Sequence, residues 1–155
     1  MTVLAHLAIL ALVALSVALL PATGDADLDF RRVLAGEIMR GVATAHEARL
    51  LMSIARWESH YREDVADCRT PGGKCNADGW DCDQGPFQHH TESAAERVEV
   101  CGSLEGAVRV AVRDVRRSFA VARELPEPER LSVYVGGPRW RDERSRRMSR
   151  TRWVP

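Results

Sequence analysis

The four cysteines of this chain constrain its fold more than any other feature. They are Cys68, Cys75, Cys82 and Cys101, all in the middle third of the 155 residues. An even number of cysteines in a small exported protein predicts two disulfides, although the spacing leaves all three connectivities open. A zinc site is the alternative, because Cys68, Cys75, Cys82 and His89 recur every seven residues. Structural zinc ligands usually come in pairs two to four residues apart, so the spacing favours disulfides.

The N-terminal residues have the pattern of an export signal. The apolar run "LAILALVALSVALL" is followed by "PATG", which supplies small residues for a cut after Gly24. We therefore expect residues 1–24 to be a signal peptide, the mature chain to begin at Asp25, and the protein to be secreted or periplasmic. A retained N-terminal anchor is the alternative, because the run counted from Val3 reaches about the lower limit for a membrane span. A helix buried in the domain is the third. The membrane is a partner only if the segment is retained.

The charge composition excludes one broad class of partner. The chain has 22 basic and 22 acidic residues, so its formal net charge is zero. A nucleic-acid-binding domain typically carries a basic surface, so we expect no nucleic acid as a partner. The basic cluster at residues 139–152 is expected to be the solvated face of a helix. The length fits one domain, which we place at residues 25–155.

Apolar periodicity predicts a mostly α fold. A first helix over residues 28–40 is expected to be capped by Asp25 or Asp27. Its predicted core stripe is Phe30, Val33, Leu34 and Ile38. The capping boxes "TAHE" and "SAAE" predict helices that begin at Ala45 and Ala94. Ser103 is expected to cap the longest helix, which ends before Pro126, and a last helix spans residues 141–153.

Between these helices, residues 62–90 lack helical periodicity. They contain glycine, proline, aspartate and three of the cysteines, so they predict a long disulfide-bonded loop with a short hairpin at "ADGWD", residues 77–81. Loops of this length inside a compact domain are usually either functional or disordered, and the disulfides favour a functional loop.

Glu58 occupies an unusual position in the second predicted helix. Leu51, Ile54 and Glu58 are three and four residues apart, so the carboxyl group lies on the same stripe as the core residues. A carboxyl group at the end of an apolar stripe is partly desolvated, which favours the neutral form that a general acid needs. Trp57 and Trp80 are candidates for stacking on sugar rings, and a core role is equally open for Trp57.

Three segments in this order resemble a known family. "ESHY" at 58–61, "GPFQ" at 85–88 and "YVGG" at 134–137 are similar to the three-part signature of lytic transglycosylases and goose-type lysozymes. The resemblance covers most of residues 44–152 and implies a lysozyme-like α domain. Pro86 and Phe87 stand where that family has Leu-Met, and Val135 stands where it has Asn.

The resemblance also implies an activity and a site. It implies cleavage of the bond between N-acetylmuramic acid and N-acetylglucosamine, with glycan strands of peptidoglycan as partner and no cofactor or metal. Glu58 would be the general acid/base. The implied substrate contacts are Ser59, Gly85, Phe87, Gln88 and Tyr134.

Two questions stay open at the level of sequence. Asp81 and Asp83 are the nearest candidates for a second carboxylate, but neither is clearly placed, which favours a transglycosylase over a hydrolase. The other class of function is a secreted, disulfide-stapled module that keeps the fold and binds a glycan or a protein without turnover.

Overall fold

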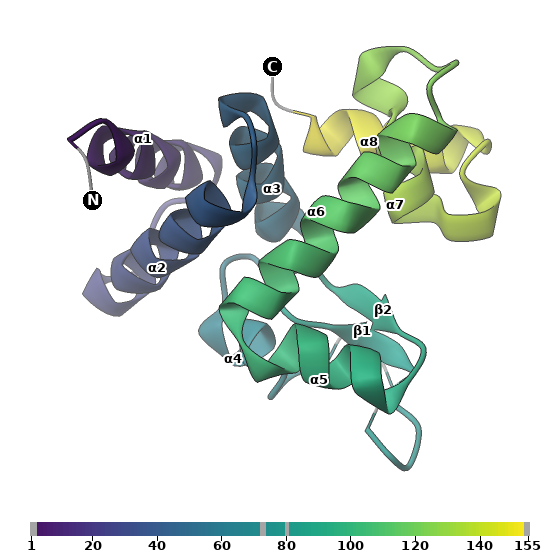
Figure 1. The fold of residues 1–155 in the computed structure, drawn as a ribbon, viewed down its shortest axis with the longest axis horizontal. Helices are drawn as coiled ribbons and strands as arrows, with labels where there is room; N and C mark the ends of the chain where they lie inside the picture. The colour runs from purple at the N-terminus through teal and green to yellow at the C-terminus, as the bar shows by residue number, and fades with distance from the viewer. Residues whose placement is uncertain (1–2, 72–73, 80, 154–155) are drawn as a thin grey trace. The chain divides into compact units, whose positions relative to one another are not determined.

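A computed structural model describes residues 3–71, 74–79 and 81–153 of the chain. The described residues are mostly helical, with one two-stranded sheet (Figure 1). This confirms the predicted mostly α class. The chain divides into two compact units, Met1–Ala111 and Val112–Pro155, and each is described by itself below.

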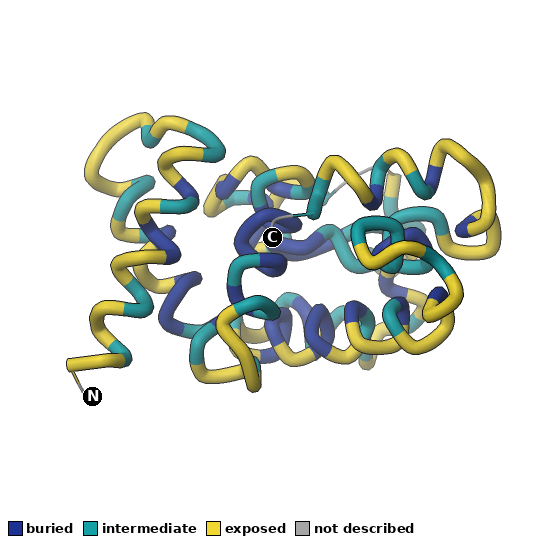
Figure 2. The backbone as a smooth tube through the Cα atoms, turned by 90° about the horizontal axis from the view of Figure 1, so that it is seen from above, coloured by how far each residue is buried: buried dark blue, intermediate teal, exposed yellow. Residues whose placement is uncertain are grey.

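The first unit contains five helices, the hairpin and the start of a sixth helix within the described residues. The elements are α1 (Val3–Leu19), α2 (Asp25–Gly41), α3 (Ala45–Glu58), α4 (Glu63–Ala66), β1 (Cys82–Gln84), β2 (His89–Thr91), α5 (Ala94–Gly102) and α6 (Leu104–Val121), which continues into the second unit. Helices α1, α2 and α3 pack against one another, and α5 lies along the hairpin (Figure 1). Buried and exposed positions alternate along the helices, as expected for helices with one face on a core (Figure 2).

Both predicted capping boxes form. The Oγ1 of Thr44 accepts a hydrogen bond from the amide of Glu47 at 3.1 Å, and Ser93 caps α5 in the same way through the amide of Glu96. The Glu47 carboxylate reaches back to the amide of Ala43, one residue before the cap, at 2.9 Å. The predicted starts of both helices are confirmed because these interactions are local to the chain.

The start of α2 differs from the prediction. The capping position is Gly24, and neither Asp25 nor Asp27 caps the helix. The carboxylate of Asp27 instead accepts a hydrogen bond from the amide of Thr23 at 2.9 Å and pairs with Arg31. An aspartate in the first turn is stabilised by the positive end of the helix dipole without being the capping residue.

The buried face of α2 is rotated by about one residue from the predicted stripe. Leu34 and Ile38 are fully buried as expected, but Val33 is exposed and Arg31 is buried in its place. An arginine can occupy a core position only when its charge and its donors find partners. The partners of Arg31 come from α1 and from Asp27, as described below.

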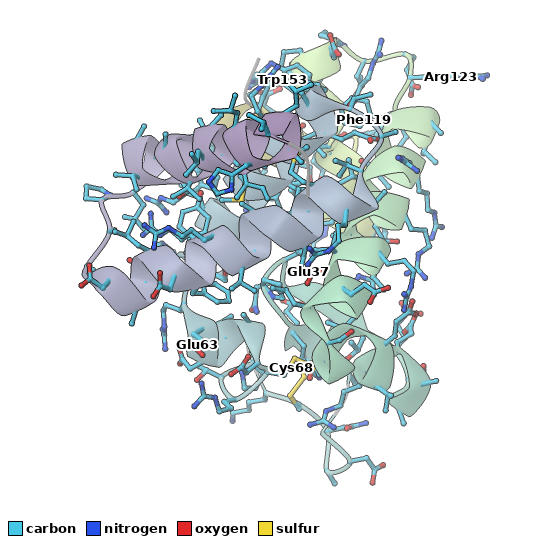
Figure 3. The ribbon with its side chains drawn as sticks, turned by 60° about the vertical axis from the view of Figure 1, so that its left-hand side comes forward. Glu37, Glu63, Cys68, Phe119, Arg123 and Trp153 are labelled. Atoms are coloured by element: carbon cyan, nitrogen blue, oxygen red, sulfur yellow. A yellow bond between two sulfur atoms is a disulfide. The ribbon has the colours of Figure 1, made fainter. Side chains whose placement is uncertain are left out.

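The middle of the chain forms the expected disulfides and a hairpin. Cys68 pairs with Cys101 across 33 residues, and Figure 3 shows this bond beside the Cys68 label. Cys75 pairs with Cys82 across 7 residues. All four thiols are therefore used, and the zinc alternative is wrong. Strands β1 and β2 are antiparallel, with Cys82 opposite Thr91, so the turn of the hairpin is residues 85–88. The short hairpin predicted at residues 77–81 is therefore wrong in position, because the strands that pair are residues 82–84 and 89–91, and the described residues 77–79 and 81 precede them.

The second unit is built around buried serine hydroxyls. After the end of α6 it contains η1 (Glu127–Glu129), α7 (Ser132–Gly136), η2 (Gly137–Arg139) and α8 (Glu143–Arg152). Ser149 of α8 accepts a hydrogen bond from the amide of Leu131 at 3.0 Å and donates one to the carbonyl of Pro128 at 2.8 Å. Such serine hydroxyls satisfy the backbone hydrogen-bonding groups of a segment that has little regular structure. In the same unit, Phe119 stacks on Trp153 with ring centroids 6.2 Å apart (Figure 3).

Neither the apolar N-terminal helix nor any other helix among the described residues combines the length and the apolar character needed to cross a membrane.

Candidate active site

Glu58 is the last residue of α3, and its side chain is half-buried. Ser59 follows as the helix cap and is almost fully buried. Its hydroxyl donates a hydrogen bond to the carbonyl of Ala55 at 2.9 Å, so this group closes the last turn of the helix. The predicted role of Ser59 as a substrate contact stays a prediction, and while the hydroxyl donates to Ala55 it can only accept a hydrogen bond from a substrate.

The backbone directly after Ser59 is strained. His60 and Tyr61 both have a positive φ, 56° and 58°, in the left-handed region that residues other than glycine seldom adopt. Each such residue costs on the order of 1 kcal/mol or more and persists only where the surroundings impose it. For Tyr61, the packing and the hydrogen bond of its side chain impose this backbone conformation. The Tyr61 side chain is 2% exposed, and its hydroxyl donates a hydrogen bond to the carbonyl of Met52 at 2.9 Å.

Tyr61 is held from the other side by Arg31. The guanidinium carbon lies 4.4 Å from the centroid of the tyrosine ring, a cation–π contact. Burial raises the pKa of Tyr61 well above its usual range, and this outweighs the opposing effect of Arg31. The hydroxyl therefore stays a hydrogen-bond donor at every physiological pH.

Arg31 itself is 1% exposed and is the principal residue that sequence reasoning missed. Its Nε is 2.7 Å from a carboxylate oxygen of Asp27. Burial raises the pKa of Asp27, but the hydrogen bonds from Arg31 and Thr23 outweigh that effect, so the net shift is downward. A signal was present in the sequence: Arg31 lies four residues after Asp27 and on the same face as Leu34 and Ile38.

A cavity of about 540 Å³ adjoins the strained turn. Its walls come from the link between α1 and α2, from the start of α2, and from residues 60–64. Apolar walls are supplied by Leu20, Pro21 and Phe30, and polar ones by His60 and Arg31. Its volume lies within the range of small-molecule sites.

The "GPFQ" segment forms the hairpin turn. Phe87 is 2% exposed, so its ring is part of the core. The side-chain amide of Gln88 donates a hydrogen bond to the carbonyl of Gly85 at 3.0 Å, within the turn itself. A Cβ on Gly85 would lie 2.8 Å from Cγ1 of Val100, and the φ of Gly85 is 75°. The structure thus gives each of the three predicted contact residues a role in the turn or the core.

The two candidates for a second carboxylate share one partner. A carboxylate oxygen of Asp83 lies 3.1 Å from Nδ1 of His90, its neighbour across the hairpin, and one of Asp81 lies 3.4 Å from Nε2. All three side chains are partly exposed. The structure therefore brings Asp81 and Asp83 together through His90.

Tyr134 belongs to the second unit, where it lies in α7 and is half-buried. Its amide donates a hydrogen bond to Ser118 Oγ at 3.0 Å. A Cβ on Gly136 would lie 2.2 Å from Ser145 Oγ, so this glycine permits α8 to approach. Because Glu58 lies in the other unit, the pairing of Tyr134 with Glu58 stays a prediction.

Trp57 precedes Glu58 and is 42% exposed, so it is not a core residue. The guanidinium carbon of Arg56 lies 5.1 Å from its ring centroid. Trp80 lies outside the described residues. Within those residues, no group of three or more His, Cys, Asp or Glu side chains is arranged to hold a metal ion.

In the comparisons with known proteins, no family model, no curated protein and no solved structure matches the chain.

Proposed function

We propose that this protein is an exported enzyme that cleaves the bond between N-acetylmuramic acid and N-acetylglucosamine in peptidoglycan, with Glu58 as general acid/base. The observation that carries the proposal is the position of Glu58 at the end of α3, followed at once by the strained turn of His60 and Tyr61. Strained backbone conformations concentrate at functional sites. The motif resemblance assigns its catalytic glutamate to this same residue.

Two further observations support a glycan-cleaving site at Glu58. The side chain is half-buried, so it is held by its surroundings and is still accessible to a substrate. The exposed ring of Trp57 in the preceding position offers an apolar face on which a sugar ring can stack.

The reaction we propose is a transglycosylation. The Glu58 carboxyl group protonates the glycosidic oxygen, and the bond from that oxygen to C1 of the muramic sugar breaks. The resulting carboxylate then takes a proton from a hydroxyl of the same muramic sugar, whose oxygen attacks C1 and closes an anhydro ring. This sequence uses one carboxyl group as acid and then as base. It fits a chain whose nearest candidates for a second carboxylate, Asp81 and Asp83, are both bound to His90.

Export and removal of residues 1–24 are part of the same proposal. The two disulfides are consistent with a location outside the cytoplasm, where such bonds persist.

A binding module without turnover is the second candidate, and a specific observation favours it. Three predicted substrate contacts are engaged elsewhere: Ser59 in its own helix, Phe87 in the core and Gln88 in its own turn. Side chains that stabilise the fold in this way are expected in a protein that keeps the fold without needing these three residues for turnover.

The test uses Glu58→Gln, which preserves size and polarity and removes the transferable proton. Cell-wall turbidity clearing should fall at least about 100-fold, while pull-down on insoluble peptidoglycan should persist. Glu92→Gln is the matched control, because Glu92 is an exposed glutamate of the same unit, in the loop before α5. Mass spectrometry of the products separates the reactions: anhydro-muramic ends indicate transglycosylation and reducing ends indicate hydrolysis. Clearing by Glu58→Gln at the parent rate would exclude the mechanism, and binding without clearing by the parent would favour the binding module.

A further inference from the structure

The guanidinium of Arg31 has two edges with different partners. Along one edge, Nε and Nη2 each donate a hydrogen bond to one carboxylate oxygen of Asp27, at 2.7 and 2.8 Å. Along the other edge, Nη1 donates hydrogen bonds to the carbonyls of Ser16 and Leu20, at 3.1 and 2.6 Å. Nη2 donates its second hydrogen bond to the carbonyl of Pro21 at 3.5 Å. The second edge therefore binds the carboxyl end of α1 and the residues directly after it.

Arg56 of α3 binds the same segment. Its Nε donates a hydrogen bond to the carbonyl of Leu19 at 3.2 Å. The last carbonyls of a helix have no partner within the helix, so arginines supplied by other helices can satisfy them. Residues 16–21 thus occupy a site for peptide oxygen atoms that is formed by α2 and α3.

Helix α1 is attached to this site by one narrow face. Leu12, Val13 and Ser16 are its buried residues. Leu4, Leu7 and Val17, on the other side, are exposed. Only Leu12, Val13 and Ser16 of its 17 residues are buried, and the proposal below requires that α2 and α3 keep their structure when α1 leaves.

If residues 1–24 leave, the donors of the second edge lose their acceptors. Asp27 still neutralises Arg31, but Arg56 adds a second positive charge. An arginine edge with two parallel donors matches the two oxygens of a carboxylate, and it does so better than it matches separate carbonyls.

We propose that removal of residues 1–24 opens a site for the free α-carboxylate of a short peptide, bound by Arg31 and Arg56. Leu20, Pro21 and Thr23 leave with the removed segment, and Phe30 and Tyr61, on the remaining wall of the cavity, offer apolar contacts to the peptide's side chains. This proposal rests on the proposed removal of the leader, and it does not require turnover by Glu58. If peptidoglycan is the substrate, its peptide stems carry carboxylates of this class.

The experiment starts from the full chain with a specific protease site inserted between Gly24 and Asp25. The protein is folded and oxidised, cut, and freed of its N-terminal fragment by adsorption to a hydrophobic resin. The probe is acetyl-Ala-Ala with a free carboxylate, and the control probe is the same dipeptide with a C-terminal amide. Binding is followed by calorimetry and by the fluorescence of Trp57, next to Arg56, and circular dichroism reports the helices.

The cut protein should bind the carboxylate at least about tenfold more tightly than the amide, and the uncut protein should bind neither. Arg31→Lys keeps the charge and loses the two-donor edge, so its affinity for the carboxylate should fall at least about tenfold. Arg32→Lys is the matched control, because Arg32 is the exposed neighbour and pairs with Asp29.

Four outcomes would overturn the proposal. Equal binding of acid and amide would exclude carboxylate recognition, and equal binding by cut and uncut protein would place the site elsewhere. A fragment that stays bound after cutting, or loss of helical structure when it leaves, would make α1 a permanent part of the core. Because no readout depends on clearing, these failures are distinct from a failure of Glu58 as the acid.

Discussion

The larger disulfide should contribute more to stability than any other covalent feature of the chain. The Cys68–Cys101 bond closes a loop of 33 residues and the Cys75–Cys82 bond closes one of 7. In the chain-entropy treatment, the longer loop corresponds to about 3.7 kcal/mol at 25 °C and the shorter one to about 2.3 kcal/mol. Replacing both partners of the longer loop by serine should therefore lower the free energy of unfolding by roughly 3 to 4 kcal/mol. Serine suits these two positions because both are half-buried.

The assay is urea denaturation followed by circular dichroism, with the slope of the transition checked for two-state behaviour. The matched comparison is the replacement of Cys75 and Cys82 by alanine, which should cost about 2.3 kcal/mol, with a further cost for the buried sulfur of Cys82. A loss below about 1 kcal/mol for the Cys68 and Cys101 variant would refute the reasoning, because the loop would then already be ordered in the unfolded ensemble.

Three further predictions concern single side chains. Gly85→Ala should destabilise the protein by about 1 to 3 kcal/mol more than Gly79→Ala in thermal denaturation, because both glycines have a positive φ but only Gly85 is in close contact with Val100; equal losses would remove the steric argument. Ser149→Ala should cost about 1 to 3 kcal/mol, because it removes the partner of the buried Leu131 amide and a donor to the part-buried Pro128 carbonyl; an unchanged melting temperature would contradict this. Hydrogen bonds from Arg62 and Thr70 hold the pKa of Asp64 at about 2, below its usual 3.8. The stability that ionised Asp64 contributes to the folded state is therefore present above pH 3.8 and lost as the pH falls to about 2. Asp64→Asn should abolish that part of the acid sensitivity, measured by proteolysis of the loop between pH 5 and 2, and an unchanged profile would assign it to another group.

Local interactions account for what could be predicted from sequence. The capping boxes at Thr44 and Ser93 begin their helices where expected, because each needs only residues within one turn. The number of disulfides was predictable from the cysteine count, and their connectivity was not, because it depends on which parts of the loop lie side by side. The partial burial of Glu58 agrees with its spacing to Leu51 and Ile54, which places it on the apolar face of α3.

The tertiary structure decided the roles of the polar residues. The burial of Arg31 depends on carbonyls at the end of α1, 10 to 15 residues earlier in the chain, which no periodicity reveals. The register of the hairpin makes "GPFQ" a turn with Phe87 inside the core, and the role of this segment in a cleft stays a prediction. Asp81 and Asp83 are separate loop residues in the sequence, and the pairing of strands gives them a common partner in His90. Periodicity reports which face of an element is apolar. The partner of a buried charge or hydrogen-bonding group depends on which distant backbone and side-chain atoms the fold brings within about 3 Å of it.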